Sequence, residues 1–241
     1  ERDARADLER ANGELEAFLY SVSHDLKSPL VSLSGYLSYL TQDYAEVLGA
    51  GGREYLDRMA ANAGYMQNLI QDLLELSRVG RIQTEASDVD LRALVEDVAT
   101  EVRQGGGEAR VEIGPLPVLS MNPVRARQLF TNLLDNAVVH GGRPDITIRV
   151  RAVESGDGSV VVSVSDDGVG IPERYREKVF GVFERLEGRR GRGTGIGLAV
   201  CRKIVESIGG RIWIAVSEQG TDIRIEMPAN VVHGWHAEVG S

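Results

Sequence analysis

The stretch "NPVRARQLFTNLLDNAVVHGG", residues 122–142, carries the signals of a complete helix. Asn122 can accept hydrogen bonds from the free N–H groups of a first turn, and proline is favoured at the position that follows such a cap. Gly141 and Gly142 are typical of a helix end. The stretch therefore predicts one long helix with a capping residue at each end.

Strand patterns follow this helix. The segments "ITIRVRAV" (146–153) and "SVVVSVSDD" (159–167) alternate apolar and polar residues on either side of the turn sequence "ESGDG". The segments "RIWIAVS" (211–217) and "TDIRIEM" (221–227) predict a second hairpin. Further elements are a helix at 91–102, a strand at 109–113 and a glycine-ended helix within 194–210. Hairpins combined with a few long helices predict an α+β fold, an α/β sandwich with a mixed sheet and helices on one face.

The first eighty residues have a different, heptad-like pattern. Apolar residues recur at steps of 3 and 4 from Leu8 to Leu40, apart from three steps of 4 between Phe18 and Leu30, and again from Tyr55 to Leu76. Glycines at 49, 51 and 52 separate the two runs. We predict an antiparallel helical hairpin. Because a hairpin covers only one side of each apolar stripe, a homodimer forming a four-helix bundle is expected.

These patterns divide the chain into a lead-in and hairpin (1–80), a polar linker (81–89), an α/β domain (90–228) and a tail (229–241) for which no regular structure is expected. The net charge of −9 argues against nucleic-acid binding, which needs a basic surface. The single cysteine, Cys201, excludes an intrachain disulfide and favours a reducing, cytoplasmic compartment. No apolar run is long enough to span a membrane.

His24, in "YSVSHDLKSPL" (20–30), is the first candidate for chemistry. It lies two residues from both Val22 and Leu26, about 200° from either seam position, so it should point outward. Pro29 removes the helical hydrogen bond to the carbonyl of Asp25, and a bend is expected there. An exposed neutral imidazole beside a carboxylate is typical of a nucleophile, with Asp25 orienting the ring.

Two glycine clusters indicate where a ligand would bind. "DDGVGIP" places Gly168 and Gly170 directly after a strand, and "GRRGRGTGIGL" alternates glycine with other residues just before a helix. Glycine lets the backbone approach a ligand closely, and a helix N-terminus presents free N–H groups to phosphate. The spacing matches neither a P-loop nor a dinucleotide-binding fingerprint. Asn132 and Asn136 share one helix face and carry oxygen ligands suited to Mg²⁺, while Asp166 could accept from the adenine amine. By themselves the asparagines could equally form a solvated helix face, and Asp166 could be a turn residue.

Taken together, these residues resemble the sensor histidine kinases of two-component systems, over about residues 10–228. "SHDLKSPL" is similar to their phosphoacceptor box, "NLLDNAVVH" to their asparagine box, "DDGVGI" and "GTGIGLAV" to their glycine boxes, and "VFGVF" (179–183) to their phenylalanine box. The ordered set is far more specific than any one box.

The resemblance implies roles for individual residues. His24 would be phosphorylated with the help of Asp25, and Ser28 would occupy the position linked to phosphatase activity. Asn136 and Asn132 would bind Mg²⁺ and phosphate, and Phe180 and Phe183 would anchor the lid over the nucleotide. The remaining expected ATP contacts are His140, Asp166, Gly168, Gly170, Ile171, Arg185, Gly193, Thr194, Gly195, Gly197 and Leu198.

The resemblance also implies an ATP-dependent kinase that passes phosphate from His24 to the receiver domain of a response regulator and can act as its phosphatase. A sensor domain would lie upstream of this stretch. Val139 departs from the family, which usually has lysine there, and Gly181 replaces a usual acid. Two alternatives stay open: another ATPase of the same nucleotide fold, and a non-catalytic dimeric scaffold with degenerate boxes.

Overall fold

The computed structural model describes residues 2–78, 86–104, 109–184 and 193–235. The chain forms two compact units, Glu1–Arg81 and Ile82–Ser241. Each is described separately below. No helix of the described residues has the length and apolar character needed to cross a membrane.

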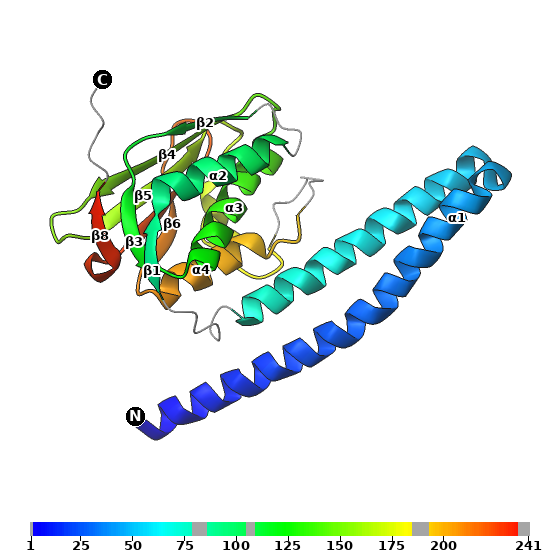
Figure 1. Cartoon of the computed structure of the whole chain (residues 1–241), viewed down its shortest axis with the longest axis horizontal. Helices are drawn as coiled ribbons and strands as arrows, with labels where there is room; N and C mark the ends of the chain where they lie inside the picture. The colour runs from blue at the N-terminus through cyan, green and yellow to red at the C-terminus, as the bar shows by residue number, and fades with distance from the viewer. Residues whose placement is uncertain (1, 79–85, 105–108, 185–192, 236–241) are drawn as a thin grey trace. The chain divides into compact units, whose positions relative to one another are not determined.

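The first unit is a helical hairpin, as predicted. Helix α1 (Arg2–Arg78) is helical throughout except at Gly49, whose φ of 64° and ψ of −170° reverse the chain (Figure 1). A positive φ is accessible to glycine without a steric penalty, which explains why glycine occupies the turn. Pro29 lies inside the first arm but does not end it.

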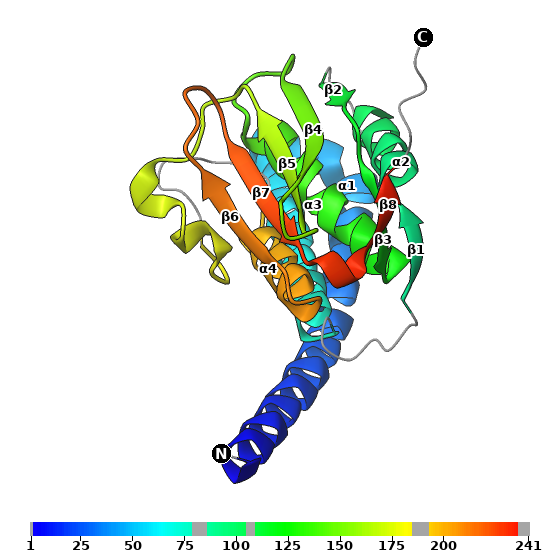
Figure 2. The same cartoon turned by 90° about the vertical axis from the view of Figure 1, so that its left-hand side faces the viewer.

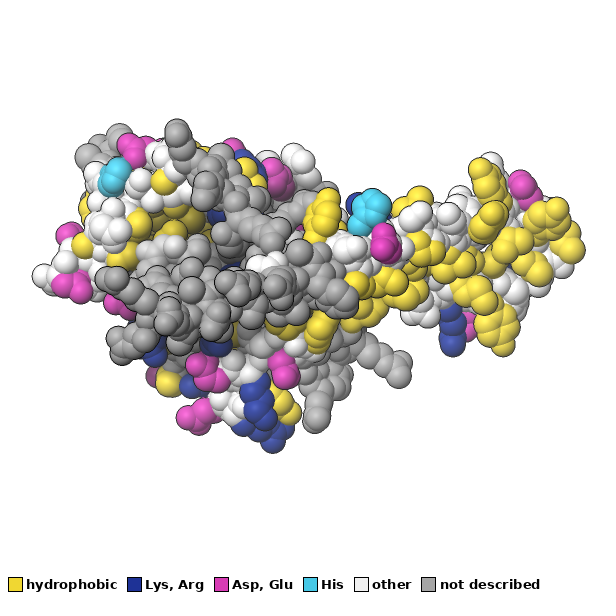
Figure 3. All heavy atoms as spheres, turned by 90° about the horizontal axis from the view of Figure 1, so that it is seen from below, with side chains coloured by type: hydrophobic (Ala, Val, Ile, Leu, Met, Phe, Trp, Pro, Cys, Tyr) yellow, Lys and Arg dark blue, Asp and Glu magenta, His cyan; other side chains and the backbone are white. Residues whose placement is uncertain are grey.

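The two arms pack through small and aliphatic side chains. Leu37, Leu56 and Ala63 form a buried cluster between them. Polar contacts add to it, because the amide of Gln67 donates to the hydroxyl of Ser34 at 3.1 Å and to the carbonyl of Leu30 at 3.5 Å. The hairpin leaves many apolar side chains uncovered, and Figure 3 shows them along its surface. On the first arm they recur every seven residues, at Leu26, Leu33, Leu40 and Val47.

The second unit contains a five-stranded mixed sheet with the order β2-β4-β5-β7-β6. Among the described strands of this sheet, only the β2–β4 pair is parallel. Alternate side chains of the strands, such as Val150, Val162 and Ile225, are fully buried. The strands are β2 (Arg110–Ile113), β4 (Thr147–Glu154), β5 (Val160–Asp166), β6 (Arg211–Ala215) and β7 (Asp222–Met227).

Three helices of the described residues cover one face of this sheet, and none of them lies on the opposite face (Figures 1 and 2). They are α2 (Leu91–Gln104), α3 (Pro123–His140) and α4 (Gly197–Ser207). The predicted cap of α3 is confirmed, because the side chain of Asn122 accepts hydrogen bonds from the N–H groups of Val124 and Arg125. Phe130 of α3 is fully buried at the centre of the unit. The expected sandwich with helices on one face is therefore correct.

A second, three-stranded sheet was not predicted from the sequence. Its strand order is β1-β3-β8, with β1 (Ser87–Asp90), β3 (Pro117–Met121) and β8 (Val232–Trp235). Both pairs are antiparallel. Two expectations are thereby corrected: residues 87–89 belong to a strand and not to a linker, and the tail is regular over Val232–Trp235. The imidazole of His233 lies 2.7 Å from the carboxylate of Asp88 and ties β8 to β1.

Three short 3₁₀ turns complete the unit. They are η1 (Glu173–Tyr175), η2 (Lys178–Phe180) and η3 (Ala229–Val231). The first two follow the first glycine cluster, and the third leads into β8.

Candidate active site

Asp166 stands at the end of β5, where the first glycine cluster begins. Its Oδ1 accepts hydrogen bonds from the N–H groups of Gly168 at 2.9 Å and Thr221 at 3.2 Å, and the Thr221 hydroxyl also bonds to the carboxylate. Burial raises the pKa of Asp166, although these hydrogen bonds oppose the shift. The two main-chain donors fix the carboxylate so that Oδ2 can still accept a hydrogen bond from a ligand.

Glycines hold three backbone segments in contact around this carboxylate. A β-carbon on Gly168 would lie 2.6 Å from the carbonyl oxygen of Gly141, and one on Gly170 would lie 2.7 Å from that of Gly220. Real β-carbons do not approach so closely, so a side chain at either position would displace the backbone. Gly170 and Gly220 also have positive φ angles, of 68° and 70°.

Sequence reasoning missed Gly220 and Thr221, although they complete the Asp166 site. The N–H of Asp166 donates to the carbonyl of Thr221 at 2.8 Å. Asp166 and Thr221 therefore each donate their N–H to the other residue. The only local sign in the sequence was a glycine directly before a strand, which ordinary hairpins also have. The pairing of β5 with β7 brings this turn to Asp166.

Helix α3 carries the asparagine pair. Asn132 is half-buried, and its amide Nδ2 donates to the carbonyl of Gly197 at 3.3 Å. Asn136 lies one turn later on the same helix and is also half-buried. The hydrogen bond of Asn132 therefore joins α3 to Gly197, the first residue of α4.

The second glycine cluster leads into α4. Gly195 has a φ of 75°, and the hydroxyl of Thr194 accepts from the N–H of Ile196 at 3.4 Å. Ile196 is the N-cap residue and offers no capping side chain. The first N–H groups of α4, including those of Gly197 and Leu198, thus lack an intrahelical partner and can bind phosphate oxygens.

His140 ends α3 close to this cluster. A β-carbon on Gly193 would lie 3.5 Å from Nε2 of His140, so the backbone at Gly193 passes beside the imidazole. Val139 is 43% exposed, so a longer, charged side chain such as lysine would be tolerated there.

A shallow hollow of about 240 Å³ borders the first glycine cluster. Gly170, Ile171 and Gly220 line it, together with Arg176 and the end of β6. Ile171 is half-buried here, and the two glycines connect this hollow with the Asp166 site.

The two rings of the phenylalanine box differ in exposure. Phe180 is buried, and the guanidinium of Arg202 lies 4.6 Å from its ring centre. Phe183 is 57% exposed and has a φ of 66°. The anchoring role of both residues stays a prediction. Arg185 lies outside the described residues.

The donor set fits a hard divalent cation held mainly by a nucleotide. The described residues contain no group of three or more histidine, cysteine, aspartate or glutamate side chains that could hold a metal ion. The amide oxygens of Asn132 and Asn136 are the oxygen donors on this face of α3. Mg²⁺ commonly takes one or two protein ligands and completes its shell with phosphates and water, so two amides are sufficient.

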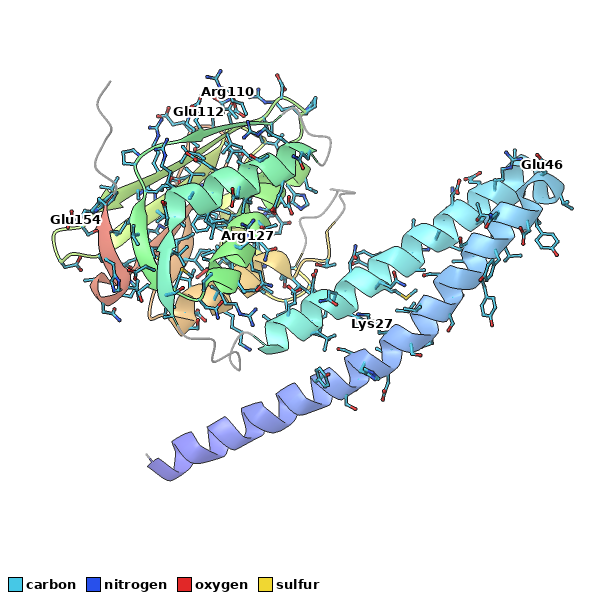
Figure 4. The ribbon with its side chains drawn as sticks, viewed as in Figure 1. Lys27, Glu46, Arg110, Glu112, Arg127 and Glu154 are labelled. Atoms are coloured by element: carbon cyan, nitrogen blue, oxygen red, sulfur yellow. The ribbon has the colours of Figure 1, made fainter. Side chains whose placement is uncertain are left out.

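The phosphoacceptor candidates lie on the first arm of α1, in the other unit. The side chains of His24 and Asp25 are 74% and 76% exposed, and Nδ1 of the imidazole lies 3.3 Å from Oδ1 of the carboxylate. Ser28 is exposed one turn later, and Lys27, labelled in Figure 4, lies on the same stretch of helix. The outward direction predicted for His24 is confirmed. The neighbouring carboxylate does reach the ring.

Family models match both units. Residues 14–82 match the His Kinase A (phospho-acceptor) domain, and residues 121–231 match the histidine kinase-, DNA gyrase B- and HSP90-like ATPase family. A full-length structure of ShkA in complex with AMPPNP aligns with a TM-score of 0.69 at 25% identity, covering 90% of this chain and 46% of that one.

Curated relatives agree with these matches. Cyanobacterial phytochrome B of Nostoc sp. is 35% identical over 86% of this chain, and the methanogenesis regulatory histidine kinase FilI of Methanothrix harundinacea is 34% identical over 92%. The chain spans 28% and 25% of the length of these two relatives. A phosphoacceptor hairpin followed by an ATPase domain of this type defines a histidine kinase core. The chain belongs to the sensor histidine kinases of two-component systems.

Proposed function

We propose that the protein phosphorylates His24 with ATP and then transfers the phosphoryl group to an aspartate of a response regulator. The observation that carries this proposal is the exposed His24–Asp25 pair on a hairpin whose sequence matches the phosphoacceptor domain. When Nδ1 donates its proton to Asp25, the lone pair of Nε2 faces solvent and can attack.

The proposed reaction is an in-line displacement. Nε2 of His24 forms a bond to the γ-phosphorus of ATP, the bond from that phosphorus to the β,γ-bridging oxygen breaks, and ADP leaves. The ring carries a positive charge after attack, and Asp25 stabilises it and accepts the Nδ1 proton. The product is a phosphoramidate.

The second unit would hold the nucleotide. Oδ2 of Asp166 accepts from the exocyclic amine of adenine, Ile171 packs on the base, and the free N–H groups at the start of α4 bind phosphate oxygens. His140 lies beside Gly193, so it can contact the nucleotide at the second glycine cluster. Mg²⁺, held by Asn136 and Asn132 together with phosphates, would neutralise charge on the transferred group.

The exposed apolar stripe of the hairpin supports a homodimer. Leu26, Leu33, Leu40 and Val47 are spaced by one heptad, and Met59 and Met66 continue the same spacing on the second arm. Such a stripe is the seam of a four-helix bundle formed by two hairpins. We further propose that Ser28 positions a water molecule for dephosphorylation of the regulator, because it lies one turn from His24.

Incubation with γ-labelled ATP tests the proposal. Wild-type protein should acquire label that acid releases and base does not, as expected of a histidine phosphoramidate. His24→Ala should bind ATP normally and remain unlabelled. An ATPase of the same fold would release labelled phosphate without labelling itself, and a scaffold with degenerate boxes would neither bind nor hydrolyse ATP.

A further inference from the structure

A segment of short turns, residues 172–181, leads away from the first glycine cluster. It contains η1 and η2 and pairs with no strand of the described residues. Its backbone hydrogen bonds within the described residues span three positions. The N–H of Tyr175 donates to the carbonyl of Pro172 at 2.9 Å, and that of Gly181 donates to the carbonyl of Lys178 at 2.8 Å. Such local bonds hold the turns together but do not attach this turn segment to the rest of the unit.

Arg202 of α4 attaches the turn segment through two contacts of its guanidinium group. Cζ lies 4.6 Å from the ring centre of Phe180, within the range of a cation–π interaction. Nη2 lies 2.8 Å from Oε2 of Glu177, the residue directly before η2. Arg202 therefore holds both ends of η2, which also packs directly against α4.

The two contacts of Arg202 differ in burial, and this decides their relative strength. The Phe180 ring is 3% exposed and the Arg202 side chain 31% exposed, so the contact between them is shielded from water, where cation–π attraction is stronger. The side chain of Glu177 is 84% exposed, and ion pairs of this kind contribute little. The ring contact should therefore provide most of the attachment, while the carboxylate orients the guanidinium.

The turn segment and α4 belong to different halves of the candidate nucleotide site. The segment begins directly after Ile171, which lines the hollow beside the Asp166 site. Helix α4 begins at Gly197, where the free N–H groups can bind phosphate oxygens. Arg202 lies five residues later, about 7.5 Å along the helix axis. Arg202 thus connects the chain that carries Ile171 with the helix that offers the phosphate donors.

We propose that Arg202 is a positioning residue for nucleotide binding, which holds the turn segment on α4 so that Ile171 meets the base while the start of α4 meets the phosphates. The inference rests on the proposed function in one respect, the placing of base and phosphates at these two sides. Without the guanidinium, the Phe180 ring would still pack, but the segment would lose its directional attachment. Nucleotide binding would then have to order the segment, and this cost lowers affinity.

The test compares Arg202→Met, which keeps the long apolar stem without the charge, with Arg202→Lys, which keeps a cation. The first readout is hydrogen exchange of the amides of residues 175–181 in the absence of nucleotide. They should exchange roughly fivefold to tenfold faster in Arg202→Met, as expected for the loss of one shielded cation–π contact. The second readout is the dissociation constant of a non-hydrolysable ATP analogue, which should rise by a similar factor. Arg202→Lys should restore most of both values.

Arg211→Met is the matched control for the change in charge. The Arg211 guanidinium also lies over an aromatic ring, 5.4 Å from the ring centre of Trp213. Arg211 is the first residue of β6, whereas the hollow is lined by the other end of that strand. Arg211→Met should therefore leave the exchange rates and the affinity at their wild-type values. An equal fall in affinity in both variants would assign the effect to net charge and overturn the inference.

A double-mutant cycle with Phe180→Leu separates the ring contact from general packing. Leucine keeps an apolar side chain in the buried position but has no aromatic face. In that background Arg202→Met should accelerate amide exchange little further, because the contact that it removes is already absent. Effects that add in full would show that the guanidinium does not act through the ring. If Arg202→Met does not fold, Arg202→Gln serves in its place.

Wild-type exchange rates together with wild-type affinity in Arg202→Met would overturn the inference. Faster exchange with unchanged affinity would also overturn the positioning role, because the attachment would then be structural only. A wild-type protein that does not bind the ATP analogue would instead overturn the proposed nucleotide site itself, whatever the exchange rates of the turn segment are.

Discussion

Gly168 and Gly141 lie in backbone contact, so that a β-carbon on Gly168 would be 2.6 Å from the Gly141 carbonyl oxygen and 2.9 Å from Oδ1 of Asp166. Gly168→Ala should therefore push the loop from the end of α3 and displace the carboxylate. We expect a loss of about 1–3 kcal/mol in the free energy of unfolding, typical of overpacking, and a large loss of ATP affinity. Urea unfolding and nucleotide titration measure the two effects.

Gly156 provides the control for this change. It lies in the turn between β4 and β5, and a β-carbon there would meet nothing within 4 Å. Gly156→Ala should alter stability by at most about 0.5 kcal/mol and leave ATP binding intact. Equal behaviour of the two variants would contradict the close packing of Gly168.

Asp166→Asn should separate stability from binding. The amide oxygen of asparagine can still accept from Gly168 and Thr221, but its N–H₂ group would face the adenine amine, so ATP affinity should fall. Burial raises the pKa of Asp166 above 3.8, so the ionised carboxylate is unfavourable in the folded protein at neutral pH. The variant should consequently be more stable than wild type at pH 7.

The upward direction of the Asp166 pKa shift determines how the free energy of unfolding depends on pH. Because the folded protein holds the Asp166 proton more tightly than the unfolded chain does, this group stabilises the fold below pH 3.8 and loses that contribution as pH rises through the folded pKa. The stability advantage of Asp166→Asn should shrink when urea unfolding is repeated near pH 4. An advantage that grows on acidification would show that Asp166 has a lowered pKa.

Phe183 combines exposure with a backbone conformation that suits glycine. Its φ of 66° is costly for a residue with a β-carbon, by roughly 1 kcal/mol, and its ring is 57% exposed. Phe183→Gly should therefore keep or slightly raise the thermal midpoint of unfolding. Phe180→Ala, which removes a ring that is only 3% exposed, should lower stability by about 3–5 kcal/mol. A large loss in Phe183→Gly would mean that its ring packs in solution.

Local patterns predicted the elements whose signals are local. Asn122 and Pro123 marked the start of α3, Gly49 the hairpin turn, and strict alternation the strands β4 and β5. The three-stranded sheet was missed because β1 reads "SDVD" and β3 begins with proline, so neither has a pattern that distinguishes a strand from a loop. They become regular only through long-range pairing, because β1 pairs with β3 and β3 also pairs with β8.

The residues of the candidate site also divide into those with a local sequence signal and those without one. His24, Asp166 and the asparagine pair were candidates because their types and spacing indicate chemistry. Thr221 and Gly220 were not, because each lies next to Asp166 only through a partner strand distant in sequence. A buried cysteine is typical of an ordinary core residue, and only the structure shows that its thiol donates to the carbonyl of Leu129.

Cys201 should be inert in the folded protein. Burial raises the pKa of its thiol to about 12, so almost no thiolate exists at pH 8. A disulfide reagent such as DTNB should label native protein only at the rate of unfolding and should label it at once in urea. Rapid stoichiometric labelling of native protein would contradict the burial of the thiol.

Val139→Lys should tighten ATP binding. Val139 lies next to His140 on α3 and is 43% exposed, so lysine can be accommodated without a cavity or a clash. Its ammonium group would add one positive charge near the phosphates, where a charge-assisted hydrogen bond contributes roughly 1.5–3 kcal/mol before losses to side-chain ordering. We expect an affinity gain of a few-fold to tenfold, measured by calorimetry with an ATP analogue.

Val124→Lys is the matched control, because it places the same charge on an exposed position of the same helix about 22 Å away along the axis. An equal gain in both variants would mean that lysine acts through the net charge of the protein and that α3 does not present residue 139 to the phosphates.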